Sequence, residues 1–266
     1  MLSNEQLRIF AERGWLIIEN AFSADRVAHW KKCLDKLHAD FASAWVHKGN
    51  APTHRSRVDN LFLLEPTMRD LCIDPVIYDC NRQLLGTSMH YLESYSWVTG
   101  PDPGRAEKRD ALRDPDTWGW HRGFRPKWGV FPDDACDSLI NSLVMRGIIY
   151  LTDVGPGHGG SAVLSGSHRL EGDYASLKDQ CEVVEAECPA GSVLLFSETL
   201  IHSAVPIVTD NTRYAMFFGF SPPWVRANHD GFLIPKETLQ SIRNEKLRAI
   251  LGGQVGFSGQ VSEMQR

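Results

Sequence analysis

The stretch GSVLLFSETLIHSAVPIVTDNTRYAMFFGF, residues 191–220, contains the most informative pattern in the chain. An apolar run ends at Phe196, a turn follows, and His202 begins the next segment. Arg213 comes eleven residues after His202, at the start of another β-prone run. Short apolar runs bounded by Gly, Pro and Asp are typical of strands in a sandwich or barrel. The stretch therefore predicts antiparallel β-structure that presents a histidine and an arginine.

Similar runs precede this stretch and predict a β-rich body. They cover residues 89–98, 139–151, 161–165, 182–186, 192–196 and 213–221. The polar residues 47–60 predict a loop. The charged, proline-containing segment 99–117 predicts either a surface loop or a lid over a functional site.

The N-terminal part of the chain is predicted to be helical. Ser3 and Gln6 fit the capping box of a short helix that ends at Gly14, and residues 15–22 predict a strand. After Ser23, apolar residues recur at the spacing of one buried helix face. These residues are Val27, Trp30, Leu34, Leu37 and Phe41.

Helices followed by strands indicate an α+β fold in which the helices buttress the sheet. Residues 61–85 are predicted to be helical with interruptions near Pro66 and Pro75. We expect one domain over residues 1–266, with a helical part at 1–88, a β core at 89–222 and a tail at 223–266. A helical run near 236–251 within that tail could cover the active site or form a dimer contact.

The composition is ordinary for a globular protein, with 42% hydrophobic and 23% charged residues among 266. The net charge of -5 argues against binding nucleic acid through a broad basic surface. No apolar stretch of about 18 residues occurs, and the first residues lack a signal-peptide pattern, so we expect a cytoplasmic protein without a membrane partner. The six cysteines form no CxxC pair, which argues against a zinc ribbon. A monomer and a homodimer are both compatible with these features.

Three motifs carry the functional signal. His121 lies in WGWHRGFRPKW (118–128), a glycine-rich element GPGHGGSAVLSGSHR spans 155–169, and the His202–Arg213 pair follows. In this order the chain resembles the phytanoyl-CoA dioxygenase-like family of iron(II)- and 2-oxoglutarate-dependent oxygenases, from the N-terminal helices to about Phe220. Gly159-Gly160 and Gly166-Ser167-His168 match the middle element of that family, although Ser165 stands where proline is common.

The resemblance implies a double-stranded β-helix, a cupin-like jelly roll, and a site for Fe(II), 2-oxoglutarate and O2. It implies that His121 and His202 bind iron and that Arg213 binds the far carboxylate of 2-oxoglutarate, with Ser203 or Thr212 assisting. The residue types suit these roles. Two histidines leave iron positions open for an oxo acid and O2, and the planar guanidinium takes a carboxylate through two charge-assisted hydrogen bonds.

Gly123 departs from the family's HxD motif, which would place an acidic iron ligand there. Glycine at this position resembles the iron/2-oxoglutarate halogenases, in which chloride occupies the vacated site, and this favours a halogenase acting on an unactivated C–H bond of a small molecule. The alternative is a hydroxylase whose third ligand is Glu198, four residues before His202, or water. Asp133, Asp134 and Asp137 are further candidates for that ligand. A binding protein that has lost catalysis is a third possibility.

Several other residues are candidates for lesser roles. Trp118, Arg122, Phe124 and Arg125 could contact the substrate, and Trp97, Trp120 and Trp128 could add apolar lining. Packing in the core or in a lid is the competing explanation for the tryptophans. His158 and His168 are expected to serve turn geometry or hydrogen bonding instead of binding metal.

Overall fold

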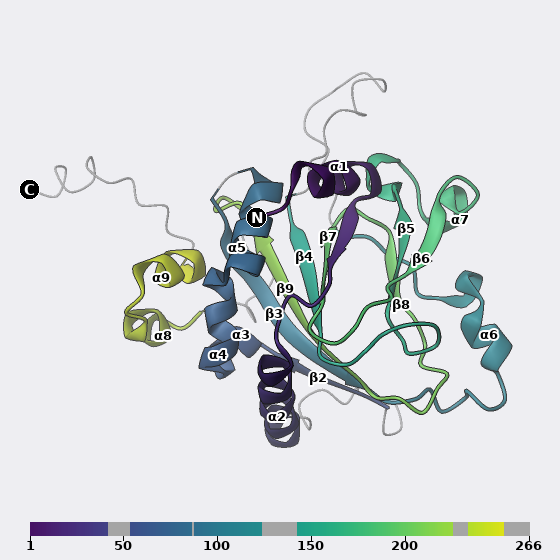
Figure 1. Ribbon diagram of the computed structural model, residues 1–266, viewed down its shortest axis with the longest axis horizontal. Helices are drawn as coiled ribbons and strands as arrows, with labels where there is room; N and C mark the ends of the chain where they lie inside the picture. Colours follow the sequence, from purple (N-terminus) through teal and green to yellow (C-terminus); the bar gives the residue numbers. More distant parts are fainter. Residues whose placement is uncertain (42–53, 87, 124–142, 226–233, 253–266) are drawn as a thin grey trace, which may run out of the picture.

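Two antiparallel sheets face each other in the computed structural model, which describes residues 1–41, 54–86, 88–123, 143–225 and 234–252 (Figure 1). The larger sheet has the strand order β1-β7-β4-β9-β3-β2, and the smaller has the order β6-β5-β8. The large sheet comprises β1 (Trp15–Ile18), β2 (Arg55–Asp59), β3 (His90–Thr99), β4 (Met145–Tyr150), β7 (Val193–Ser197) and β9 (Arg213–Ser221). The small sheet comprises β5 (Ser161–Ser165), β6 (Glu182–Glu185) and β8 (His202–Ala204).

The large sheet buries both faces, and alternate residues along each strand separate two cores. On β7, Val193 and Leu195 join the core under the helices, whereas Leu194 and Phe196 join the core between the sheets. The helical layer lies on the outer face of the large sheet, and the small sheet lies on the other face (Figure 1). The predicted jelly-roll fold is thereby confirmed.

The N-terminal helices follow their sequence signals. In α1 (Asn4–Arg13), Ser3 and Gln6 form the capping box, and Gly14 ends the helix in the left-handed conformation. In α2 (Ala24–Phe41), the predicted apolar face is buried except for Phe41, whose side chain is 42% exposed. The prediction for Phe41 is wrong because this residue is the last of the helix and lies beyond the edge of the sheet core.

The helical stretch 61–85 is broken where proline begins a new helix, as expected. It forms α3 (Leu61–Leu64), α4 (Pro66–Arg69), the 3-10 helix η2 (Asp70–Ile73) and α5 (Pro75–Leu85). The predicted loop at 47–60 is wrong in its last part, because β2 pairs from Arg55 to Asp59 with residues 95–99 of β3. Polar, charged residues are common on edge strands, and β2 is at the edge of the large sheet.

The segment 99–117 forms no lid over the cavity described below. It contains α6 (Arg109–Arg113) and the 3-10 helix η3 (Pro115–Thr117), and it is fixed to the β8–β9 connection through the hydrogen bond from Asp102 N to Ile207 O and the ion pair between Arg105 and Asp210. None of residues 100–117 lines that cavity.

The tail forms α8 (Lys236–Ser241) and α9 (Glu245–Gly252). Leu247, Ile250 and Leu251 of α9 are buried in the core on the helical side of the large sheet, so this helix covers the face away from the cavity. Of the two roles suggested for the tail, covering the active site is not what α9 does. Among the described helices, none is both long and apolar enough to cross a bilayer.

Candidate functional site

A cavity of about 240 Å³ opens between the two sheets. Its lining joins the imidazoles of His121 and His202 from the small-sheet side to the guanidinium of Arg213 from the large sheet. Aromatic rings and three further ionic side chains complete it. These additional lining side chains are Arg55, Tyr95, Trp97, Arg146, Phe196, Glu198 and Phe217.

His121 and His202 are held together by their own main chains. His121 N donates to His202 O at 3.0 Å, and His202 N donates to His121 O at 2.8 Å, so the segment at 121 extends the small sheet beyond β8. The ring centroids lie 4.4 Å apart. The predicted pairing of these two histidines, distant in sequence, is a feature of the fold.

Both imidazoles are oriented for coordination through Nε2. The Nδ1 of His121 lies 2.9 Å from Gly119 O, and the Nδ1 of His202 lies 2.8 Å from Leu200 O. Because a carbonyl can only accept, Nδ1 carries the proton and the Nε2 lone pair is left for a metal. Burial, and then the charge that His121 can carry, lower the pKa of His202 to about 4. His202 is therefore neutral at physiological pH, as a ligand must be.

Arg213 is buried at 3% exposure at the start of β9. Its Nη1 donates to Gly159 O in the glycine-rich element, and its Nη2 lies 3.4 Å from Thr99 Oγ1. Within the described part of the chain, Arg213 has no acidic partner and its Nε has no hydrogen-bond acceptor. Burial lowers the pKa of Arg213 to about 10, which leaves it protonated at neutral pH. A buried cation with an unused donor fits an anionic ligand.

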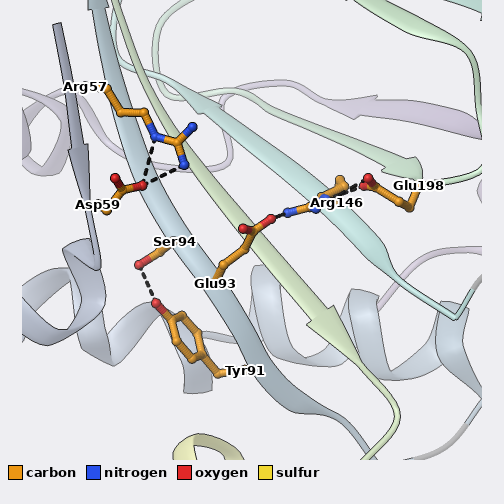
Figure 2. Close-up of polar contacts among 7 residues, drawn as sticks. All are labelled: Arg57, Asp59, Tyr91, Glu93, Ser94, Arg146 and Glu198. Atoms are coloured by element: carbon orange, nitrogen blue, oxygen red, sulfur yellow. Dashed lines mark hydrogen bonds and ion pairs between the residues drawn. The ribbon is translucent and has the colours of Figure 1, made fainter. Parts of the chain in front are cut away.

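The space beside Gly123 is filled by Glu198. A β-carbon at position 123 would overlap the carboxylate and Cγ of Glu198, and Gly123 N donates to Glu198 O at 2.8 Å. The Glu198 carboxylate is ion-paired with Arg146 of β4, and Arg146 is also paired with Glu93 of β3. Figure 2 shows Arg146 lying between the two carboxylates. Glycine at 123 therefore accommodates a carboxylate that arrives from the β7–β8 turn.

In this conformation the Glu198 carboxylate points toward Arg146 and does not form a close group of three ligands with His121 and His202. Among the described residues, the group of three potential ligands whose donor atoms all lie within 4.8 Å of one another is His29, Cys33 and Glu65, which is remote in sequence from His121 and His202. Direct coordination by Glu198 therefore requires its side chain to turn away from Arg146.

The remaining predicted site residues divide into three groups. Ser203 is buried and lines the cavity, whereas Thr212 is exposed and does not. Trp118 and Arg122 do not line the cavity, and their contact with substrate stays a prediction: Trp118 Nε1 donates to Leu112 O at 2.9 Å, and Arg122 Nη1 donates to Leu170 O at 3.0 Å. The candidates that lie outside the described residues are Phe124, Arg125, Trp128, Asp133, Asp134 and Asp137.

The other aromatic and histidine predictions have mixed outcomes. Trp97 lines the cavity, but Trp120 stacks on Tyr174 with ring centroids 4.5 Å apart. His168 packs against Gly14 and its Nε2 lies 3.2 Å from Ala11 O, so it joins the glycine-rich turn to α1. His158 forms an isolated bridge with Ile207. Neither histidine lines the cavity, in agreement with their expected structural roles.

Sequence reasoning missed Arg146 and Glu93. Arg146 is the one charged residue in the apolar run MRGIIY, which is itself a signal, since a charge within a buried strand needs a partner. Glu93 is likewise buried, at 7% exposure, within β3. Their pairing depends on strand order, which the sequence does not reveal.

The comparisons with known proteins agree with this geometry. The family described as "Phytanoyl-CoA dioxygenase (PhyH)" matches residues 10–215. Ectoine dioxygenases of Bordetella parapertussis and Bordetella bronchiseptica are 25% identical over 171 residues, covering 63% of this chain and 50% of each relative. The chain thus spans about half the length of the curated relatives it matches.

Solved structures share the fold at lower sequence identity. HygX from Streptomyces hygroscopicus, with nickel and 2-oxoglutarate bound, has a TM-score of 0.64 at 20% identity, covering 85% of this chain and 89% of HygX. EctD from S. alaskensis, with bound Fe, has a TM-score of 0.65 at 21% identity, covering 86% of this chain and 80% of EctD. By its sequence match and its jelly-roll fold, the chain belongs to the phytanoyl-CoA dioxygenase family, whose members are Fe(II)- and 2-oxoglutarate-dependent oxygenases.

Proposed function

We propose that this protein is an Fe(II)- and 2-oxoglutarate-dependent oxygenase that hydroxylates an unactivated C–H bond of a small molecule. The observation that carries the proposal is that two imidazoles and one buried arginine line the same cavity. Each imidazole has its Nε2 left for a metal, and the arginine has no carboxylate partner among the described residues. His121 and His202 would hold the metal, and Arg213 would hold the far carboxylate of the oxo acid. Bound iron with 2-oxoglutarate supplies the activation of O2 that the side chains cannot provide.

The chain's own residues define the rest of the chemistry. Arg213 neutralises and orients the distal carboxylate through donors that are already desolvated, which costs little reorganisation. Tyr95 and Phe217 stack with centroids 4.8 Å apart on the inner face of β3 and β9, giving the cavity an apolar wall that excludes water. Arg55, with its guanidinium over the Trp97 ring at 4.6 Å, adds positive charge to the lining. A small substrate with an apolar body suits this surface.

Hydroxylation is favoured over halogenation because the Gly123 space already holds a carboxylate. We infer that Glu198 supplies the negative charge that an acidic residue at position 123 would otherwise bring. The ion pair with Arg146 keeps this carboxylate near the site.

Halogenation is the second candidate, and the absence of an acid at position 123 is the observation that favours it. In that case chloride would need the space that Glu198 fills, so the Glu198 side chain would have to move further from Gly123. The two candidates thus differ in what occupies one position beside the metal.

An anaerobic titration of the Fe(II)-loaded protein with 2-oxoglutarate tests the proposal through the metal-to-ligand charge-transfer band. We expect a saturable band in the wild type, loss of the band in His202→Ala, and roughly 10- to 100-fold weaker 2-oxoglutarate binding in Arg213→Lys, because lysine cannot supply the two-pronged bond. Normal affinity in Arg213→Lys would contradict the assigned role. No band at all would contradict the proposed function.

Adding chloride to the same complex separates the two candidates. Under the hydroxylase proposal the band is indifferent to chloride in the wild type, and Glu198→Gln weakens iron binding. A saturable chloride-dependent shift, with unchanged iron affinity in Glu198→Gln, would favour halogenation instead.

A further inference from the structure

A second potential metal site lies in the helical layer, away from the cavity. Cys33 comes four positions after His29 on α2, so the two side chains lie on one face of the helix. Glu65 comes from the turn that begins α4, and its side chain is the N-cap of that helix. One donor atom from each of the three residues lies within 4.8 Å of the others.

The spacing of the sulfur and nitrogen donors matches that of two ligands in a tetrahedral zinc centre. With Zn–S near 2.3 Å and Zn–N near 2.0 Å, the sulfur and nitrogen ligands of a tetrahedral ion lie about 3.5 Å apart. Cys33 Sγ and His29 Nε2 are 3.6 Å apart. The pair is thus spaced as two ligands of one ion would be, and the Glu65 donor lies within 4.8 Å of both.

Glu65 is held in place by contacts with Thr67 and Cys33. Its Oε1 accepts from Thr67 N at 3.1 Å and from Thr67 Oγ1 at 3.0 Å. Both bonds use the same oxygen, and the carboxylate also forms a hydrogen bond with the Cys33 thiol, so it already faces the sulfur. Thr67 Oγ1 also lies 3.2 Å from His29 Nε2, a contact that a cation bound at Nε2 would replace.

The surroundings leave a fourth position open. His29 is exposed, whereas Cys33 and Glu65 are partly buried. A shallow surface cavity of about 390 Å³ adjoins them and is lined by His29, Thr67 and Trp30, among others. Three protein ligands with one position open to water are typical of accessible zinc sites, and thiolate with imidazole selects zinc over calcium or magnesium.

The thiol now holds its proton. Burial, and then the Glu65 carboxylate, raise the pKa of Cys33. A divalent cation would replace that proton on the Cys33 sulfur. Its charge would offset the repulsion between the Cys33 thiolate and the Glu65 carboxylate, and binding would release a proton.

We propose that His29, Cys33 and Glu65 form a zinc-binding site that ties α2 to the start of α4. The site is independent of the cavity and of the oxygenase activity proposed above. Bound zinc would cross-link α2 to the start of α4.

Cobalt(II) provides a probe that distinguishes this site from the cavity. A cobalt–thiolate bond gives a charge-transfer band in the near ultraviolet, and no cysteine is among the residues that line the cavity. Titration of the full-length protein under anaerobic conditions is expected to give this band with one equivalent of cobalt, and zinc is expected to abolish it by displacement. The band should persist in a His121→Ala/His202→Ala variant.

Single substitutions then assign the ligands. Cys33→Ser is expected to remove the band, and His29→Ala and Glu65→Gln to weaken cobalt binding by at least tenfold. Cys181→Ser is the matched control, because Cys181 is also a partly buried free thiol but lies outside the cluster. His29 is exposed, so its replacement is not expected to disturb folding, and circular dichroism verifies this for each variant.

Two results would overturn the proposal. One is the absence of a thiolate band at stoichiometric cobalt, which would mean that Cys33 and His29 share only a hydrogen bond. The other is a band that survives Cys33→Ser. Neither result would affect the 2-oxoglutarate titration, so the two proposals fail separately.

Discussion

At the scale of single residues, the site depends on which side chain fills the space that Gly123 leaves. A larger residue there would collide with Glu198, and Glu198 cannot retreat freely because Arg146 holds its carboxylate. Positions 123 and 198 are therefore sterically coupled, so a larger side chain at 123 would displace the side chain of Glu198.

Replacing Gly123 by alanine tests this coupling. The added methyl group is expected to push Glu198 aside and to weaken Fe(II) binding by about tenfold, equivalent to about 1.4 kcal/mol. The affinity is measured by anaerobic titration with a competing chelator. Gly119→Ala is the control, because a β-carbon at Gly119 meets no atom within 4 Å. Equal affinities in the two variants would show that Glu198 does not contribute to the metal site.

His38 is expected to make stability depend on pH. It is buried, with Nδ1 2.7 Å from Ser56 Oγ and Nε2 2.8 Å from Ser96 Oγ, and burial lowers its pKa from 6.5 to about 4. Between these pH values the unfolded chain binds a proton that the folded chain does not. The free energy of unfolding should therefore fall by up to about 3 kcal/mol as the pH drops from 6.5 to 4.

Urea denaturation of the wild type and His38→Gln over this pH range measures the effect. Glutamine keeps a polar side chain at this position but does not titrate, so the pH dependence should be shallower in the variant. His202 has a shift in the same direction, which is common to both proteins and cancels in the difference. Parallel pH profiles would exclude His38 as a source of the dependence.

At the scale of elements, an ionic bridge spans three neighbouring strands. Glu93 of β3 and Arg146 of β4 are both paired in register with Gly219 of β9, which lies between them. Because glycine has no side chain, Arg146 can reach across β9 to Glu93 (Figure 2). The bridge joins the sheet interior to the cavity wall.

Arg146→Met is expected to lower the free energy of unfolding by about 3 kcal/mol, because it leaves two carboxylates without a counter-charge in a poorly hydrated place. Adding Glu93→Leu should restore part of that loss, since one unpaired charge is then removed. Chemical denaturation of the two variants measures both effects. A double variant less stable than Arg146→Met would mean that Glu93 has another partner of equal importance.

The sequence predicts the elements whose signals are local. The capping box at Ser3, the prolines that begin α4 and α5, and the buried face of α2 each depend on neighbouring residues, and all are found. By contrast, β2 and β8 could not be predicted: β2 is polar, and β8 has three residues. His121 and Arg213 were found through motif order, but the Glu93–Arg146–Glu198 contacts require strand order and register, which come only from the folded chain.

At the scale of the whole molecule, the cavity uses both sheets. His121 and His202 belong to the small-sheet side, whereas Arg213 begins β9 of the large sheet. A metal and oxo acid bound by all three would connect the two layers. Ligand binding and fold stability should therefore be linked.

Fe(II) and 2-oxoglutarate together are expected to stabilise the wild type, by about 2.7 kcal/mol at 100 times the dissociation constant. Anaerobic thermal unfolding with each ligand alone and with both measures this linkage. In Arg213→Leu the response to Fe(II) should remain, while the further response to 2-oxoglutarate should disappear. A full response to 2-oxoglutarate in that variant would place the oxo acid elsewhere.

The reciprocal hydrogen bonds between the main chains of His121 and His202 have a consequence for how this protein can change. Side chains alternate across a β ladder, so a slip of one residue would turn one imidazole away from its partner. Loops between the two histidines can therefore gain or lose residues in any number as long as the bridge keeps its register. A single insertion next to the bridge would have a different effect, because it would reverse the parity of the ladder. The pairing of His121 with His202 therefore tolerates changes in the length of the intervening loops, but not a change in the register of the bridge.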